Sequence, residues 1–316
     1  MSHGSRAADY SNCQLSHHKP HVEFEIVERL GGKMKDHAPG FSVDALAARA
    51  STPLRNHPIN ALKADWKVFS PEAACPSALE NDFIRAIDVQ SALLPERGLR
   101  LVAWETYYDY APAGWIGGDY CDLIEADNGD LFFLFGDAVG KGIMGSMIAS
   151  QLYALFRTLL SVGLPLNQML DRANRLFYES MAPDYYATVV CGRASSAGTV
   201  ELINAGHLPP LILRSWRAMP LAATGLPLGL FHTSTYEITK LQLAPGETLL
   251  LYTDGITEAR NHSDVEYGAE CLAHFAAERG HLSAEQLVRA CVDDVTAFTT
   301  GTELSDDRTI MALRRA

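Results

Sequence analysis

The chain has 316 residues, of which 47% are hydrophobic, and a formal net charge of −12 from 26 Lys and Arg against 38 Asp and Glu. This composition is typical of a globular protein with enough apolar residues for one large domain or two ordinary ones. The acidic balance and the lack of a Lys and Arg cluster argue against nucleic-acid binding. We therefore expect a protein or a small molecule as substrate.

The longest apolar stretch, Ile143 to Leu166, is interrupted by polar residues such as Arg157. It falls short of the roughly 20 unbroken apolar residues of a membrane span, so it predicts a buried helix. The N-terminus shows no signal peptide, and the six cysteines form no C-x-x-C pair. These features predict a cytoplasmic protein with no membrane insertion.

Residues 1–80 carry many Gly and Pro residues without steady hydrophobic periodicity. This pattern predicts a poorly defined, partly disordered N-terminal segment. Within it, Val22–Leu30 alternates like a strand and Val43–Ala50 resembles one short helix. No function follows from this segment.

A linker or regulatory helix is predicted over residues 81–95. Asn81 or Asp82 can cap its start, and Pro95 stops it. The apolar residues between them recur at helical spacing, which would give the helix one apolar side.

Strands dominate the predicted elements of residues 96–316, and helices interrupt them in two pairs. The strand-like runs are Leu101–Tyr107, Leu131–Phe135, Ala187–Arg193, Val200–Asn204, Leu211–Leu213, Thr248–Tyr252 and Thr309–Leu313. The helical pairs are Gly142–Val162 with Leu166–Met181, and Gly268–Arg279 with Ser283–Phe298. A turn at 195–198 predicts a hairpin, and Ser283 with Gln286 predicts a capping box. Strands in bulk with inserted helix pairs predict an α+β fold of antiparallel sheets covered by helices.

Four short aspartate motifs are the strongest functional signal of the chain. They are Gly-Gly-Asp119-Tyr-Cys-Asp122, Gly-Asp137-Ala-Val-Gly-Lys141-Gly, Tyr-Thr-Asp254-Gly and Ser-Asp306-Asp307-Arg-Thr. Carboxylates held together at the margin of a core repel by about 4 kcal/mol per pair at 4 Å with an effective dielectric constant near 20. A divalent cation removes this penalty, and oxygen ligands without His or Cys favour Mg²⁺ or Mn²⁺.

Asp137 follows an apolar strand-like run and precedes a glycine-rich turn, and Asp254 follows another such run and precedes Gly255. That position brings a carboxylate to the end of a strand, where it suits a metal site. A turn or helix-cap aspartate is the alternative for either residue alone. Two such aspartates together favour the metal site.

Other phosphate-binding and catalytic motifs do not match. The loop at Gly136–Gly142 has three residues between its glycines instead of the four of a P-loop, and Gly142 stands where a P-loop has Ser or Thr. No cysteine is followed six positions later by arginine, and no H-E-x-x-H occurs. His207, in a Gly-His-Leu-Pro turn, could be a catalytic acid or a ligand, although such a histidine more often fixes loop geometry. Cys121 is predicted to be a small buried thiol.

The chain resembles the PPM metal-dependent protein phosphatases, most closely their bacterial SpoIIE/RsbU-like branch, over about residues 82–315. The matching segments, in order, are Val89–Pro95, Gly117–Asp122, Gly136–Gly142, Asn204–Pro210, Gly225–Gly229, Leu251–Glu258 and Asp306–Thr309. The resemblance implies an αββα sandwich of two antiparallel sheets flanked by helix pairs, with 96–316 as the phosphatase domain. It also implies two Mn²⁺ or Mg²⁺ ions at one edge of the sheets.

The resemblance also implies roles for individual residues. Asp137 would bridge both metals and the carbonyl of Ala138 would bind one of them. Asp254 and Asp306 would complete the second metal, with the choice between Asp306 and Asp307 open, and Asp119 would act directly or through water. Gly118, Gly140 and Lys141 would lie at the substrate phosphate, and His207 would be the candidate proton donor. Cys121 departs from the aromatic residue that is usual there, which affects local packing rather than the carboxylates.

The implied activity is hydrolysis of a phosphoserine or phosphothreonine by a two-metal-activated water. The implied partner is a phosphorylated regulatory protein, a STAS-domain anti-sigma-factor antagonist, and the linker helix would support a homodimer. Two alternatives stay open from the residues: a pseudophosphatase that only binds a phosphoprotein, and a metal-dependent hydrolase of small phosphate esters.

Overall fold

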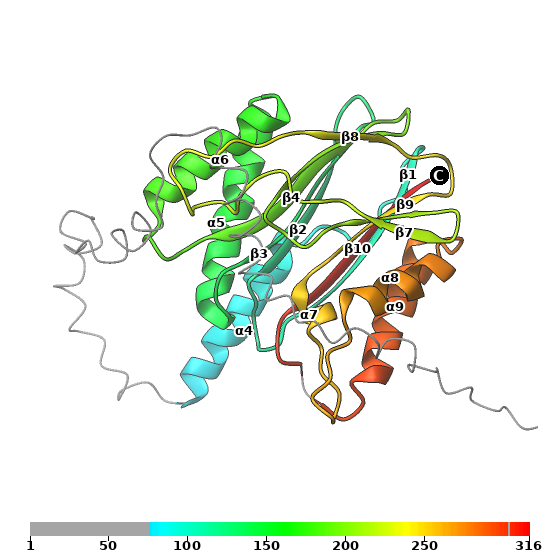
Figure 1. Ribbon diagram of the computed structural model, residues 1–316. Helices are drawn as coiled ribbons and strands as arrows, with labels where there is room; N and C mark the ends of the chain where they lie inside the picture. The colour runs from blue at the N-terminus through cyan, green and yellow to red at the C-terminus, as the bar shows by residue number, and fades with distance from the viewer. Residues whose placement is uncertain (1–75, 303) are drawn as a thin grey trace, which may run out of the picture. The chain divides into compact units, whose positions relative to one another are not determined.

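Two five-stranded antiparallel sheets lie face to face between two layers of helices (Figure 1). The computed structural model describes residues 76–302 and 304–316, which all belong to one compact unit, Pro71–Ala316. The strand predicted at Val22–Leu30 and the helix predicted at Val43–Ala50 lie outside the described residues, as does most of the predicted 1–80 segment. The predicted αββα architecture is confirmed.

The strands are divided evenly between the two sheets. One sheet has the order β1-β10-β9-β6-β7, and its strands are β1 Trp104–Ala111, β10 Arg308–Arg315, β9 Thr248–Tyr252, β6 Leu211–Arg214 and β7 Arg217–Pro220. The other has the order β2-β3-β4-β5-β8, and its strands are β2 Asp119–Glu125, β3 Leu131–Ala138, β4 Ala187–Ala194, β5 Thr199–Ala205 and β8 Thr239–Gln242. The predicted hairpin is confirmed as β4 and β5, which pair from Ala194 and Val200 onward.

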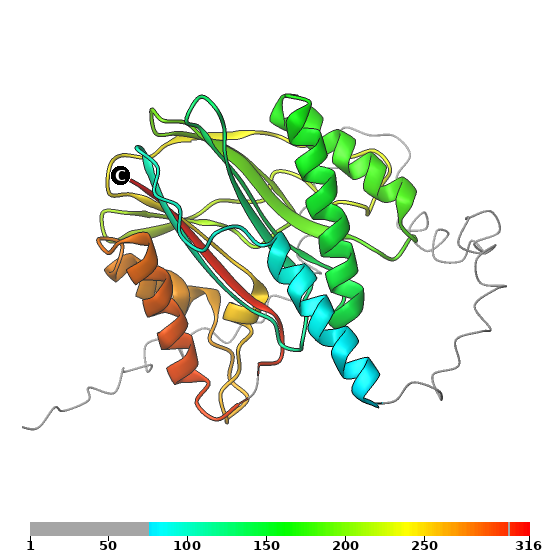
Figure 2. The same ribbon diagram turned by 180° about the vertical axis from the view of Figure 1, so that it is seen from behind.

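Helices cover the outer face of each sheet. On the β3 sheet lie α5 Gly142–Ser161 and α6 Leu166–Ser180, and on the β10 sheet lie α8 Ala269–Glu278 and α9 Ala284–Phe298. A single turn, α7 Asp254–Thr257, follows β9. The remaining helix, α4 Pro76–Leu93, runs alongside α5 (Figure 2). Ser283 caps α9 and forms the predicted capping box with Gln286.

The apolar run in β3 shows why this strand is buried on both sides. Leu131, Phe133 and Phe135 pack between the two sheets, together with Trp104 of β1. Phe132 and Leu134 point the other way and pack under α5 and α6. Because successive side chains of a strand face opposite sides, a strand covered on both faces needs apolar residues at every position.

Several predicted boundaries were wrong, and three strands were missed. Helix α4 begins at Pro76, before the predicted caps Asn81 and Asp82. The predicted strand at Leu101–Tyr107 instead begins at Trp104, because a tight turn is closed by a hydrogen bond from Leu101 N–H to the Trp104 carbonyl. Strand β2 was missed because Asp119 and Asp122 interrupt its apolar pattern, although both are buried. The edge strands β7 and β8 have largely exposed residues and give no alternation.

By length and apolar composition alone, α5 could cross a membrane. In the fold it is a core helix, because Ile148, Leu152 and Phe156 on its inner side are buried against the β3 sheet and α6. This placement agrees with the buried helix predicted for the apolar stretch that begins at Ile143.

An ion pair fastens the C-terminal part of α5 to β2. Arg157 donates from Nε and Nη2 to both carboxylate oxygens of Asp122, at 2.6 and 2.7 Å. The Asp122 side chain is 2% exposed, whereas Arg157 is 42% exposed. A buried carboxylate needs such a partner, since an unpaired buried charge is costly. The pair therefore fixes how α5 lies on the sheet.

We predict that Arg157→Met lowers the free energy of unfolding by about 1–3 kcal/mol, because Asp122 then stays buried without its two donors. Urea denaturation measures this change. The control is Lys240→Met, which removes an exposed cross-strand pair with Glu201 and is expected to cost less than about 1 kcal/mol. Equal effects of the two substitutions would show that the Arg157 pair does not fasten the helix.

Candidate active site

The four aspartate motifs meet at one end of the sandwich. Asp119 begins β2 and is paired in register with Asp137 near the end of β3. Asp254 follows β9 after one residue, Thr253, and Asp306 and Asp307 directly precede β10, the antiparallel neighbour of β9. One sheet thus supplies the first two aspartates and the other sheet supplies the remaining three.

Asp119 joins the two sheets. Its Oδ2 accepts hydrogen bonds from the hydroxyls of Thr253, at 2.8 Å, and Thr309, at 2.6 Å. Asp119 is 2% exposed, and both threonines are fully buried. Burial, and next the neighbouring Asp137 carboxylate, raise the pKa of Asp119 well above its ordinary value, while the two hydroxyls act against this rise.

Asp137 and Asp254 face an excess of negative charge. Burial, followed by the carboxylates of Asp254, Asp306 and Asp307, raises the pKa of Asp137 to about 8. Burial, followed by Asp306 and Glu258, raises the pKa of Asp254 to about 6. Carboxylates that resist ionisation in this way would be stabilised as anions by a bound cation.

Asp306 and Asp307 are placed differently. Both oxygens of Asp307 are occupied, since Oδ1 accepts from Ala113 N–H at 2.8 Å and Oδ2 accepts from Gly118 N–H at 2.6 Å. Asp307 is 4% exposed, whereas the Asp306 side chain is 28% exposed. The geometry therefore favours Asp306 over Asp307 as the one available to a metal.

A positive group already lies at Asp306. The Lys141 ammonium donates to Asp306 Oδ2 at 2.7 Å and to the Ser305 carbonyl at 2.8 Å. The hydrogen bond to Asp306 raises the pKa of Lys141, so the ammonium stays charged. Lys141 thus occupies a position where a cation is stabilised by carboxylate oxygens.

The donor chemistry fits Mg²⁺ or Mn²⁺, which bind carboxylate and carbonyl oxygens. The buried hydroxyl of Tyr110 also lacks a well-formed hydrogen bond among the described residues, beside Asp307 and Asp119. Within residues 76–302 and 304–316, however, no three His, Cys, Asp or Glu side chains are already gathered as a metal-binding group. Ligation by Asp119, Asp137, Asp254, Asp306 and the Ala138 carbonyl therefore stays a prediction.

Glycines allow the loops of the site to pack closely. A β-carbon on Gly118 would lie 2.8 Å from the Ala138 carbonyl oxygen and 2.9 Å from that of Gly140. Gly140 has a φ of 95°, which favours glycine. Gly145, in the first turns of α5, packs against Gly118, so a β-carbon there would lie 2.9 Å from Gly118 Cα. The N-terminus of α5 is therefore held against the Asp119 motif.

His207 is buried and fully hydrogen-bonded. Its Nε2 lies 3.1 Å from the Tyr252 carbonyl, and its Nδ1 lies 2.8 Å from the Thr188 hydroxyl. Because a carbonyl only accepts, Nε2 carries the hydrogen and Nδ1 accepts from Thr188. Its backbone N–H and carbonyl both bond the Asn204 side chain. Burial lowers the pKa of His207 to about 4.

Sequence reasoning missed several residues of the site, although they lie inside or next to its motifs. Thr253 and Thr309 flank the predicted aspartates and hold Asp119, and Gln90, in the helix segment before Pro95, bonds Gly117. For the two threonines, their position beside the motif aspartates was the signal in the sequence that could have revealed them. Cys121 is 2% exposed, which confirms the predicted small buried thiol, and burial raises its pKa well above the ordinary value.

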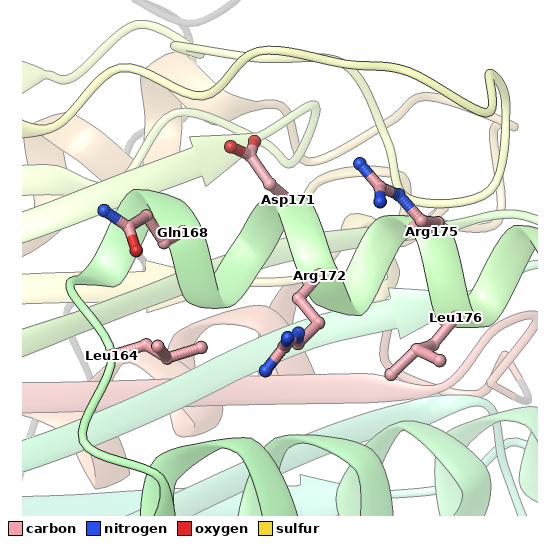
Figure 3. Close-up of a pocket in the computed structure, with 6 residues that line it drawn as sticks. All are labelled: Leu164, Gln168, Asp171, Arg172, Arg175 and Leu176. Atoms are coloured by element: carbon pink, nitrogen blue, oxygen red, sulfur yellow. The ribbon is translucent and has the colours of Figure 1, made fainter.

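A surface pocket of about 330 Å³ lies away from these aspartates. Figure 3 shows its lining residues along α6 and in the preceding turn: Leu164, Gln168, Asp171, Arg172, Arg175 and Leu176. None of the predicted site residues lines it. The chemistry is therefore expected at the aspartates, not in this pocket.

Comparisons with known proteins agree with this geometry. Residues 127–316 match the family described as Stage II sporulation protein E (SpoIIE). The chain is 24% identical over 240 residues to phosphoserine phosphatase RsbU of Bacillus subtilis, covering 75% of this chain and 71% of RsbU. It is 26% identical over 261 residues to protein IcfG of Synechocystis sp., covering 72% of this chain but 40% of IcfG. The chain thus spans well under half of IcfG.

Solved structures show the same fold. The RsbU and RsbW domains of Rv1364c from Mycobacterium tuberculosis give a TM-score of 0.59 at 26% identity, covering 69% of this chain and 62% of that one. The SiaA-PP2C domain of Pseudomonas aeruginosa gives a TM-score of 0.66 at 16% identity, covering 75% of this chain and 96% of that one. RsbX in complex with magnesium gives a TM-score of 0.51 at 14% identity, covering 69% of this chain and 98% of that one.

The family match covers more than half of the chain, and it includes the Asp137, Asp254 and Asp306 motifs that the fold gathers at one edge. The chain belongs to the SpoIIE family of PP2C-type serine/threonine phosphatases, in the branch that contains RsbU, RsbP and SpoIIE.

Proposed function

We propose that this chain hydrolyses phosphoserine or phosphothreonine on a regulatory protein with the help of two divalent metal ions. The observation that supports this most is the electrostatic repulsion at Asp137. Burial and three neighbouring carboxylates raise its pKa to about 8. A site that served only to hold the fold together would not need so many carboxylates at one edge.

Mn²⁺ or Mg²⁺ would be held by Asp137, Asp254 and Asp306, with the Ala138 carbonyl and Asp119 beside them. When bound, such ions supply an activated water and positive charge for the phosphoryl oxygens, so hydrolysis needs no covalent intermediate. The protein would position the ions through a rigid base, because Asp119 and the threonines that hold it are buried. Asp307 would not bind metal but would hold the backbone N–H groups of Ala113 and Gly118 by hydrogen bonds.

We assign Lys141 to the substrate phosphate. A metal ion at Asp306 would displace the ammonium from this carboxylate by charge repulsion, and the freed side chain, which is 61% exposed, would stay within reach of the same site. Gly118 packs against the Ala138 and Gly140 carbonyls, and Gly140 packs against Met144. Neither therefore leaves open space for a phosphate, and their contact with the substrate stays a prediction. Lys141 thus acts as a charge that binds substrate.

We assign His207 to the support of the fold. It joins β4, through Thr188, to the end of β9, through Tyr252. With both ring nitrogens bonded and a pKa near 4, His207 is a neutral imidazole at neutral pH, and its one ring hydrogen is donated to the Tyr252 carbonyl, so it is not a general acid for a leaving serine. Protonation of the leaving oxygen then falls to water.

The substrate we propose is a small STAS-domain anti-sigma-factor antagonist phosphorylated on serine or threonine. Its support is the relationship to RsbU and RsbP of Bacillus subtilis, both of which are named phosphoserine phosphatases. Comparison of such a phosphoprotein with free phosphate esters at saturating Mn²⁺ tests it. Faster turnover of small esters would favour the alternative hydrolase, and tight binding without turnover would favour the pseudophosphatase.

We predict that Asp137→Asn and Asp254→Asn each leave a folded protein that loses phosphate release by at least about 100-fold, because each removes a metal-binding charge. The matched control is Asp127→Asn, an exposed aspartate in the turn at the other end of β3. Lys141→Met, in the same assay with phosphoprotein, is expected to raise KM more than it lowers kcat. Activity within a few-fold of the wild type in both aspartate variants would exclude the assignment.

We predict that His207 makes stability depend on pH. Its pKa is about 4 when folded but near 6.5 when unfolded, so the unfolded chain binds the proton first as pH falls. Between about pH 7.5 and pH 5, the wild type should therefore lose about 2 kcal/mol more stability than His207→Gln, which does not titrate. Urea denaturation at both pH values measures the difference. Parallel losses in the two proteins would contradict a buried neutral histidine.

We also propose that α4 supports a homodimer. Ile84 and Val89 on α4 are 46% and 62% exposed, and Met147 on the neighbouring α5 is 69% exposed. Apolar side chains on one helix pair favour contact with a second apolar surface. Ile84→Ser combined with Val89→Ser, which removes these apolar side chains from α4, is expected to lower the mass measured by sedimentation or to change the hydrolysis rate. An unchanged mass and rate would argue against the dimer.

A further inference from the structure

The turn between β6 and β7 carries backbone strain. Its two central residues, Ser215 and Trp216, have φ values of 50° and 62°. Two-residue hairpin turns with positive φ at both positions most often contain Asn-Gly. A bulky side chain such as that of tryptophan is rare in the left-handed region, because its β-carbon crowds the following carbonyl oxygen. Ser-Trp is therefore an unfavourable pair for this turn.

Trp216 contributes little to the packing of the fold. It is 71% exposed, and its ring contacts the His281 ring with centroids 5.5 Å apart. It belongs to none of the hydrophobic clusters that the described residues form. A side chain that stays in water gains little hydrophobic stabilisation. Backbone strain that the packing does not explain is typical of functional surfaces.

The same turn places two arginines opposite each other. Arg214 and Arg217 are cross-strand partners, and like charges in this position are unfavourable. Arg214 forms an ion pair with Glu247 at 2.5 Å. By contrast, no carboxylate within residues 76–302 and 304–316 forms an ion pair with Arg217, which is exposed. The Arg217 guanidinium is therefore open to a carboxylate from outside the fold.

A further arginine lies next to this turn. Arg314 donates to the Gly246 carbonyl at 2.6 Å and to the His281 carbonyl at 3.5 Å, so its bonds go to backbone oxygens. His281 is the residue whose ring contacts Trp216. The chain as a whole has a net charge of −12. The surface around Trp216 thus has a sign opposite to that of the whole protein.

This hairpin tip lies at the end of its sheet away from the aspartates. Leu213 pairs with Thr248, the first residue of β9, whereas Asp254 lies two positions beyond Tyr252, the last residue of β9. Figure 1 shows β7 on the side of the C-terminus and away from α7, the turn that begins at Asp254. A peptide bound at the tip would not contact the aspartates. Binding there is consequently independent of the proposed hydrolysis.

We propose that the tip of the β6–β7 hairpin binds an acidic segment of a partner protein. Trp216 packs against an apolar side chain of that segment, and Arg217 pairs with its carboxylates. Tryptophan and arginine are the residues that most often dominate the energy of protein interfaces. Because a guanidinium group matches a carboxylate with two parallel hydrogen bonds, Arg217 favours an acidic segment over a neutral one.

The first test is Ser215→Asn combined with Trp216→Gly in the full chain, which gives the turn the residues that its backbone favours. Asn and Gly tolerate positive φ, so relief of strain is expected to raise the melting temperature by about 2–4 °C. A melting temperature below that of the wild type would show that Trp216 stabilises the fold, and it would overturn the proposal.

Binding is tested with a phage-displayed library of random linear peptides, selected on the wild-type chain and counter-selected on the double variant. The selected peptides are expected to combine Asp or Glu with an apolar residue. Their affinity, measured by fluorescence anisotropy, should fall at least about tenfold with the double variant. It should also fall severalfold with Arg217→Gln, or when amides replace the carboxylates of the peptide.

The matched control is Asp264→Gly, which relieves a φ of 59° in another turn and should leave peptide affinity unchanged. Selected peptides without acidic residues, or a library that yields no binder dependent on Trp216, would overturn the proposal. Binding to phosphatidylglycerol vesicles that depends on Trp216 would do so as well, because the occupant would then be a membrane. A lower mass of the double variant in sedimentation would likewise overturn it, since the occupant would be a second copy of the chain.

Discussion

Repulsion between buried carboxylates is the constraint on which the rest of this structure depends. Asp119 and Asp137 are cross-strand partners, and Asp254 and Asp306 add further negative charge from the opposite sheet. Such groups stay ionised only where hydrogen bonds or cations offset the cost of burial. Thr253 and Thr309 supply hydrogen bonds to Asp119, and Lys141 supplies a charge to Asp306. These partners come together only when the two sheets pack against each other in the observed arrangement.

This closure links parts of the chain that are far apart in sequence. Asp307 bonds the backbone of the 112–118 loop, whose other side contacts α4 through Gln90 and Trp115. Gly118 in turn packs against Gly145 of α5, a helix that the Arg157–Asp122 pair holds on the sheet. The C-terminal half of α4 and the N-terminal turn of α5 therefore both contact the segment that leads into Asp119.

The sequence predicted most of the fold because apolar runs such as Leu131–Phe135 and Thr248–Tyr252 coincide with strands buried on both faces. The sequence did not predict β2, where the aspartates of the site are buried among apolar residues. It also did not predict edge strands such as β7, whose residues are largely exposed. The sequence assigned the aspartate motifs to one metal site, but it did not distinguish Asp306 from Asp307 as the metal ligand. Only tertiary contacts separate them, because the donors to Asp307 lie at Ala113 and Gly118, almost two hundred residues earlier. The hydrogen bonds between Gln90 and Gly117, which are 27 residues apart, could not be predicted for the same reason.

The central claim is that these carboxylates form a hydrolytic site that works only with a divalent metal. The most direct measurement is phosphate release from para-nitrophenyl phosphate by the full chain across a Mn²⁺ titration, with a chelator blank. The account predicts turnover that rises to saturation with Mn²⁺ and disappears when the chelator is added. Turnover that is insensitive to chelator, or its absence from a folded protein saturated with Mn²⁺, would contradict it.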